Sequence, residues 1–158
     1  MMNPLFAIFL ACAVCLSSSA AEEKRLVVGK ISAELIFASA TPGDVGEALS
    51  EPRAKLLATQ EAFKGLSFRH LGRDQQQLYR SYVNWLAPLG ASKQILIEFD
   101  TLGVGKDEVR LTLKLWQNDK VILKTDIELK PGKPLIIQGP AWKGGRVLVV
   151  IDLLELKE

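Results

Sequence analysis

Residues 107–129 read DEVRLTLKLWQNDKVILKTDIEL, and each half of this stretch alternates apolar and polar residues. Alternation over this length is typical of a β-strand with one buried face. The pair Asn118-Asp119 between the halves is a turn signal, so the stretch predicts a β-hairpin. Two more apolar runs, 135–138 and 146–154, follow behind Gly and Pro residues. The end of the chain therefore predicts antiparallel β-structure.

The alternation also predicts how the two halves of the hairpin pair. A two-residue loop would place Leu111 opposite Asp126 and would put the two apolar faces on opposite sides of the sheet. The loop is therefore predicted to have an odd length, and three residues, 118–120, bring the apolar faces together. This register pairs Leu115 with Leu123, Leu113 with Thr125, Leu111 with Ile127, Arg110 with Glu128 and Lys114 with Lys124.

The rest of the chain is predicted to build onto this sheet. Residues 26–37 alternate as a first strand, and residues 78–87 are aromatic and β-branched enough for another. The polar segment 72–77 predicts a turn. Residues 51–64 carry one apolar stripe at helical spacing, with Pro52 in the first turn, and predict a helix.

Residues 146–154 are apolar on both faces, which is typical of a central strand that is covered on both sides. We expect the helix to cover one of those sides. The chain is therefore predicted to be α+β and mainly antiparallel β, with six to seven strands in a sandwich-like sheet and one helix packed on it.

The N-terminus has the pattern of an export signal. Residues 5–16 are nearly all apolar, small residues follow, and charges begin at Glu22. A run of about a dozen apolar residues is too short to span a bilayer. We expect residues 1–21 to be a signal peptide and 22–158 a single β-rich domain, periplasmic or extracellular, without a transmembrane span. Lipid anchoring at Cys12 is the alternative, because the three residues before it partly match a lipidation signal.

Composition argues against several classes of partner and cofactor. The 20 basic and 18 acidic residues leave a formal charge of +2, which gives no case for nucleic acid. Both cysteines, Cys12 and Cys15, lie in the predicted leader, so no metal site is predicted. Residues 103–106, Gly-Val-Gly-Lys, lack the first glycine and the final Ser or Thr of a phosphate-binding loop. We therefore predict a turn there, and no cofactor.

The candidates for acid–base chemistry have simpler explanations. His70 lies near Ser67 and Asp74 in sequence, but a catalytic triad must meet in space, so we interpret His70 as a structural or surface residue. Asp152 interrupts the final apolar run. We expect its carboxylate to reach water near the strand end, because an unpaired buried carboxylate is costly. No catalytic residue is predicted.

Aromatic residues give the best candidates for binding. Trp116 is predicted on the outer face of the hairpin with Arg110 and Lys114, and Trp142 in a loop over 139–145. Exposed aromatics on a β-scaffold bury area at low entropic cost, so these four residues are the candidate binding residues. The alternative, which the sequence favours because large aromatics are mostly buried, is that Trp116 packs under the helix and Trp142 folds back to plug the end of the sheet.

Two stretches carry a resemblance to known proteins. Residues 63–72 read FKGLSFRHLG, and residues 129–135 read LKPGKPL and lead to Gly139-Pro140 and to GGRV at 144–147. Together they resemble small, uncharacterised exported bacterial proteins with a leader, one helix and a β-domain. The resemblance covers most of the mature chain. It implies export and no known activity, and no catalytic residue carries over.

These observations favour an exported, non-enzymatic interaction or structural module. Its expected partner is another envelope protein or a polysaccharide. Carbohydrate binding through an exposed tryptophan is the alternative function.

Overall fold

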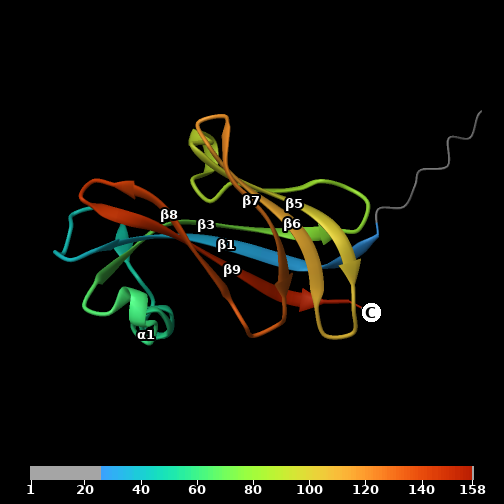
Figure 1. The fold of residues 1–158 in the computed structure, drawn as a ribbon, viewed down its shortest axis with the longest axis horizontal. Helices are drawn as coiled ribbons and strands as arrows, with labels where there is room; N and C mark the ends of the chain where they lie inside the picture. Colours follow the sequence, from blue (N-terminus) through green and yellow to red (C-terminus); the bar gives the residue numbers. More distant parts are fainter. Residues whose placement is uncertain (1–25, 158) are drawn as a thin grey trace, which may run out of the picture.

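The computed structural model describes residues 26–157, in which two antiparallel sheets pack face to face (Figure 1). The five-stranded sheet has the order β2-β3-β1-β9-β8, and the four-stranded sheet has the order β4-β5-β6-β7. In chain order the elements are β1 (Val27–Ser39), β2 (Glu47–Ala48), α1 (Glu51–Ala58), β3 (Ser67–Tyr79), β4 (Asn84–Leu86), β5 (Ile95–Val104), β6 (Val109–Gln117), β7 (Lys120–Leu129), β8 (Leu135–Trp142) and β9 (Gly145–Leu156).

The predicted fold class is confirmed, with more strands than expected. The described residues form nine strands instead of six to seven, and two of these, β2 and β4, have only two and three residues. Residues 26–157 contain one α-helix, α1. Strands this short carry too little pattern to be recognised from sequence.

Apolar residues on the facing sides of the two sheets form the main core. It includes Ile31, Leu35, Phe99, Leu111, Leu113, Val149 and Ile151. A smaller cluster lies on the other side of the five-stranded sheet, where Leu57 of α1 and Phe63 pack with residues of β1 and β9. Strands β1 and β9 are therefore buried on both faces, as predicted for the final strand, and the layers run helix, sheet, sheet (Figure 1).

The β6–β7 hairpin has the predicted register, because all five predicted cross-strand pairs are observed. The predicted three-residue loop is wrong. The turn is the two-residue pair Asn118-Asp119, with φ of 47° and 64°, and Gln117 pairs with Lys120. Two positive φ values are the signature of a type I′ turn. A β-bulge, which leaves Ile122 unmatched on β7, supplies the extra residue that brings the apolar faces together.

Strand β3 runs through the polar segment where a turn is predicted, so that prediction is wrong. Gly72 pairs with Leu35 of β1 and Gln77 pairs with Lys30. Pairing along β1 satisfies the backbone of the segment, and the polar side chains of Arg73, Gln75, Gln76 and Gln77 are exposed. The turn comes after Tyr79 instead, and the predicted strand 78–87 is reduced to the short β4.

Helix α1 is shorter than the predicted helix over 51–64. It ends at Ala58, where the Thr59 hydroxyl donates a hydrogen bond to the Leu56 carbonyl at 2.7 Å and Gln60 turns to extended backbone. Hydroxyl groups that bond to nearby carbonyls compete with helix continuation. A 3₁₀ turn, Glu61–Phe63, then carries Phe63 into the core beside Leu57.

The predicted signal peptide and the alternative lipid anchor at Cys12 lie outside the described residues. Between residues 26 and 157, no helix has the length and apolar character needed to span a bilayer.

Candidate functional site

The outer face of the four-stranded sheet carries two tryptophans in contact. Trp85 lies on β4 and Trp116 on β6, with ring centroids 5.9 Å apart and ring planes inclined by 45°. Strand β5 runs between these strands and places Glu98 beside Trp85 and beside Lys114. Trp85 is 44% exposed. We call Trp85, Trp116, Glu98 and Lys114 the tryptophan platform.

Glu98 fixes the platform from within the sheet. Its carboxylate is buried and accepts one hydrogen bond from Trp116 Nε1 at 3.0 Å and one from Lys114 Nζ at 2.5 Å. Each donor uses a different carboxylate oxygen. Hydrogen bonds to charged groups are stronger than neutral ones, and a low dielectric strengthens them further. The indole of Trp116 is therefore held in one orientation, and Trp85 packs against a fixed ring.

The hydrogen bond that Lys114 donates to Glu98 raises the pKa of Lys114 above the ordinary lysine value of 10.5. The negative charges of Glu98 and Asp100 add smaller upward contributions, and partial burial opposes them. Because the folded-state pKa is the higher one, this contribution to stability is complete below pH 10.5 and is lost as pH rises through the folded-state pKa. We expect the difference in unfolding free energy between the parent and Lys114→Met to stay constant from neutral pH to about pH 10 and then to shrink.

Urea unfolding of both proteins over an alkaline pH series measures this difference. Subtracting one unfolding free energy from the other cancels the effect of tyrosine ionisation, which both proteins share. A difference that stays constant well above the lysine pKa would contradict the assigned hydrogen bond.

The structure separates the four residues that the sequence nominates. Trp116 and Lys114 lie together on the outer face, as predicted. The alternative that Trp116 packs under the helix is wrong, because α1 covers the other sheet. Arg110 shares their strand and face, but it lies six positions from Trp116, a distance of about 20 Å along a strand. Trp142 belongs to the five-stranded sheet.

Trp142 is the last residue of β8, so the prediction that it lies in a loop is wrong. The turn is the pair Lys143-Gly144, with φ of 46° and 77°, and Trp142 pairs with Gly145. Its ring packs edge-on against Phe37, with centroids 5.5 Å apart, and Lys143 Nζ lies 4.8 Å from its centroid. Gly145 makes room for this packing, since a Cβ there would lie 2.6 Å from the Phe37 ring. Trp142 thus folds back onto the sheet and remains 38% exposed.

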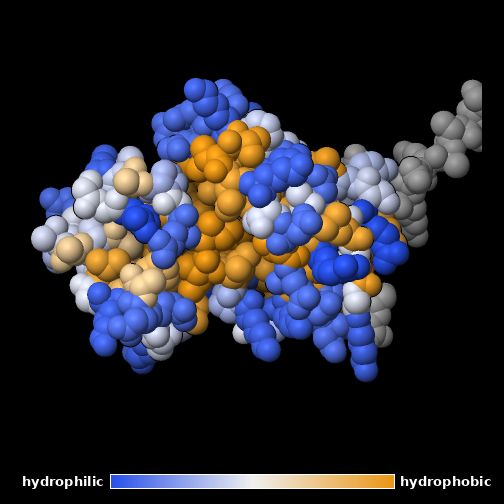
Figure 2. Space-filling model, in the orientation of Figure 1, coloured by the Kyte–Doolittle hydropathy of each residue, from blue (hydrophilic) through white to orange (hydrophobic). Residues whose placement is uncertain are grey.

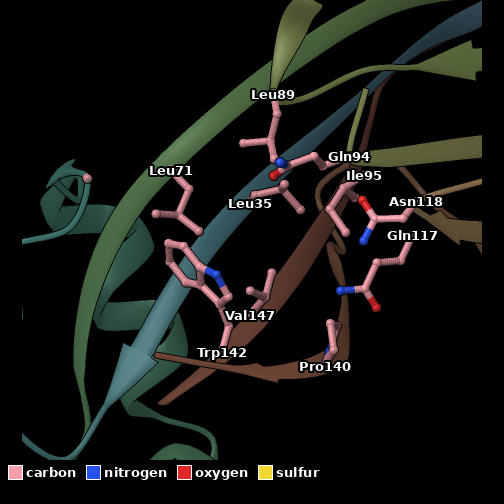
Figure 3. Close-up of a pocket in the computed structure, with 11 residues that line it drawn as sticks. Leu35, Leu71, Leu89, Gln94, Ile95, Gln117, Asn118, Pro140, Trp142 and Val147 are labelled. Carbon is pink, nitrogen blue, oxygen red and sulfur yellow. The ribbon is translucent and has the colours of Figure 1, made fainter. Parts of the chain in front are cut away.

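A cleft of about 530 Å³ opens beside Trp142, between the two sheets (Figure 3). Leu35 and Val147 of the five-stranded sheet line one side, and Ile95 of β5 lines the other. Leu71 comes from the middle of β3, and Pro140 and Trp142 come from β8. The remaining lining residues come from loops and strand ends around the opening: Gly46, Leu89, Gln94, Gln117 and Asn118. The cleft is mainly apolar, with three carboxamide side chains.

Charged side chains form a network between α1 and the five-stranded sheet. Arg53 donates from Nε to Glu34 at 2.9 Å and from Nη2 to Asp152 at 2.6 Å, and His70 Nδ1 lies 2.9 Å from the other Glu34 oxygen. Asp152 is therefore ion-paired and largely covered, and the prediction of a solvated carboxylate is wrong because Arg53 reaches it from α1. Asp74 accepts hydrogen bonds from backbone N–H groups.

Sequence reasoning did not identify Trp85 or Glu98 as partners of Trp116. The usable signal is the triplet Asn84-Trp85-Leu86, in which two buried residues flank an exposed one. Interpreting 78–87 as a single strand hid its pairing with β5. The carboxamides of the cleft carry no periodic signal, because they lie at strand ends and in a turn.

Over residues 26–157, no group of three or more His, Cys, Asp or Glu side chains is placed to hold a metal ion. Comparison of the chain with protein-family models, with curated proteins and with solved structures found no match in any of the three.

Proposed function

We propose that this chain is an exported, non-enzymatic interaction module that binds carbohydrate on the tryptophan platform. The contact between Trp85 and Trp116 on the outer face of a rigid sheet carries the proposal. Export is proposed from the apolar run at 5–16 and the small residues after it. An envelope polysaccharide is the partner that this chemistry favours.

The platform has the groups that a sugar ring needs. An indole offers a flat apolar surface on which the C–H face of a sugar ring can stack. Lys114 shares the Glu98 carboxylate with Trp116, and Asp100 lies two residues after Glu98 on β5, with its carboxylate 3.9 Å from Lys114 Nζ. These two side chains supply a donor and an acceptor for sugar hydroxyl groups. Because Glu98 already fixes Trp116, binding orders few side chains and loses little entropy.

A second envelope protein is the alternative partner for the same face. Leu96 and Val121 flank Trp116 on the neighbouring strands and extend the apolar row across the sheet. Tryptophan is enriched among the residues that dominate protein interfaces. The polysaccharide is favoured because the platform includes the charged Lys114, with the Asp100 carboxylate 3.9 Å from it, whereas the core of a protein interface is usually depleted of charge.

Retention of the purified protein on insoluble peptidoglycan, cellulose, chitin and xylan tests the proposal. We expect the parent to bind at least one of these polysaccharides. Trp85→Ala and Trp116→Ala are each expected to weaken binding by about 30-fold, which corresponds to the roughly 2 kcal/mol typical of a dominant aromatic contact.

Trp142→Ala is the matched control, because it removes an exposed tryptophan from the other sheet and should leave retention unchanged. Failure of the parent to bind any of the four polysaccharides would refute carbohydrate binding there. Crosslinking of a native envelope protein that is lost in Trp116→Ala would then assign the face to a protein. Hydrolysis of a bound polysaccharide that is abolished by one carboxylate substitution would refute the non-enzymatic role.

A further inference from the structure

The cleft beside Trp142 is separate from the tryptophan platform. It lies between the sheets, whereas the platform is on the outer face of the four-stranded sheet. Figure 1 shows the β8–β9 turn and the adjoining end of the five-stranded sheet extending beyond the four-stranded sheet. Figure 2 shows apolar residues gathered across the middle of this face, over the strands near β7, β8 and β9. The cleft has a volume of about 530 Å³, which is in the range of small-molecule sites.

The lining of the cleft carries no formal charge. Seven of its eleven residues are apolar, one is Gly46, and the other three are Gln94, Gln117 and Asn118. Lys143 contacts the Trp142 ring but is not one of the lining residues. A charged group that entered the cleft would lose water without meeting an opposite charge, which is costly. The lining therefore selects for an uncharged ligand.

The backbone fixes the positions of the three residues that carry the carboxamides. The Asn118 N–H donates a hydrogen bond to the Gln94 carbonyl at 3.0 Å, which joins the β6–β7 turn to the start of β5. Asn118 is the first residue of the type I′ turn and Gln117 pairs with Ile95. Each carboxamide can both donate and accept a hydrogen bond. This wall can therefore pair with hydroxyl, carbonyl or amide groups.

The apolar walls face these carboxamides across the cleft. Trp142 is held edge-on against Phe37, and Leu35 and Val147 are core residues whose positions the sheet sets. Figure 3 shows the Trp142 indole and Leu71 on one side and Gln117, Asn118 and Ile95 on the other. A rigid apolar surface that faces hydrogen-bonding groups is suited to a molecule with an apolar body and polar, uncharged substituents.

We infer that this cleft binds an uncharged amphipathic small molecule. Its hydrocarbon or aromatic body lies against Trp142, Leu35 and Val147, and its hydroxyl, carbonyl or amide groups face the carboxamides. The site does not depend on the proposed carbohydrate face, since the two share no residue.

Two fluorescent probes with the same aromatic body test the inference on the purified protein. N-phenyl-1-naphthylamine is uncharged, and 1-anilinonaphthalene-8-sulfonate adds a sulfonate to that body. We expect saturable binding of the neutral probe at one site per chain. We expect the sulfonate to bind about tenfold more weakly or worse, because its charge would be desolvated without a counter-ion.

The variant Leu71→Trp fills the cleft and should weaken binding of the neutral probe by about tenfold or more. Leu89→Trp fills the same space from the loop before β5. It replaces Leu71→Trp in the test if that variant does not unfold cooperatively and is therefore not properly folded. Leu154→Trp adds the same volume at an exposed site on β9 and should bind like the parent. Trp85→Ala should also bind like the parent, which separates this result from the test of the platform.

Three results would overturn the inference. These are no saturable binding of the neutral probe by the parent, equal binding by the cleft-filling variants, and equal or tighter binding of the sulfonate. Loss of probe binding as the chain forms a dimer would assign the cleft to a second copy and would overturn it as well.

Discussion

Replacing Arg53 with methionine is expected to lower the free energy of unfolding by about 3 to 5 kcal/mol, the usual cost of removing one partner from a buried ion pair. The side chains of Arg53, Glu34 and Asp152 are only 13%, 8% and 18% exposed. Methionine keeps most of the apolar stem but leaves two carboxylates without their shared cation. His70 still contacts Glu34, so Asp152 loses its only ion-pair partner in the described network. Urea unfolding followed by circular dichroism measures the change.

Lys55→Met is the matched control on the same helix. Lys55 pairs with Glu51 at 2.6 Å, but both side chains are about three-quarters exposed, at 74% and 76%. Exposed pairs of this kind contribute about 0.5 kcal/mol or less. Combining Arg53→Met with Glu34→Gln and Asp152→Asn should recover part of the loss, because it removes the unpaired charges. A cost for Arg53→Met as small as that of Lys55→Met would contradict a structural role for the network.

Replacing Phe99 with alanine is expected to destabilise the protein by about 3 to 5 kcal/mol, the range for a fully buried phenylalanine. Phe99 is 0% exposed and lies in the core between the two sheets. Its truncation removes apolar contacts and leaves a cavity that the rigid sheets cannot close. The strand itself should persist, since its backbone still pairs with Asn84 and Leu113. Thermal and urea unfolding measure the loss.

Trp85→Ala is the control for this substitution, because it truncates a larger aromatic on the neighbouring strand that faces outward. It is expected to cost about 0.5 to 1.5 kcal/mol, the usual value of an aromatic pair. This result would also establish that the variant used in the carbohydrate test is folded. A similar cost for the two substitutions would contradict the assignment of Phe99 to the core and Trp85 to the surface.

The hairpin illustrates how much of the fold could be predicted. Its register follows from the requirement that Leu111, Leu113 and Leu115 share a buried face with Leu123 and Ile127, and this requirement holds in the structure. The turn length does not follow from it. A β-bulge and a longer loop each add the one residue that brings the two apolar faces to the same side of the sheet. The apolar pattern therefore cannot distinguish between them.

The candidate sites were harder to predict because each joins distant parts of the chain. Arg53 and Asp152 are 99 residues apart, and a salt bridge between them depends on α1 lying over β9. Trp85 contacts Trp116 only because the sheet places β4 and β6 on either side of the same strand, β5. Single residues at such positions leave no periodic trace in the sequence.

By itself, the sequence determined the mainly antiparallel β class, the hairpin register and the outward direction of Trp116 and Lys114, because alternation along a strand is a local property. Only the tertiary structure decided that Glu98 lies beneath Trp116, that Asp152 is paired and that Trp142 borders a cleft of uncharged residues. Each of these features depends on which faces meet after the sheets have paired. The packing of the two sheets and the helix fixes that choice, and no local pattern contains it.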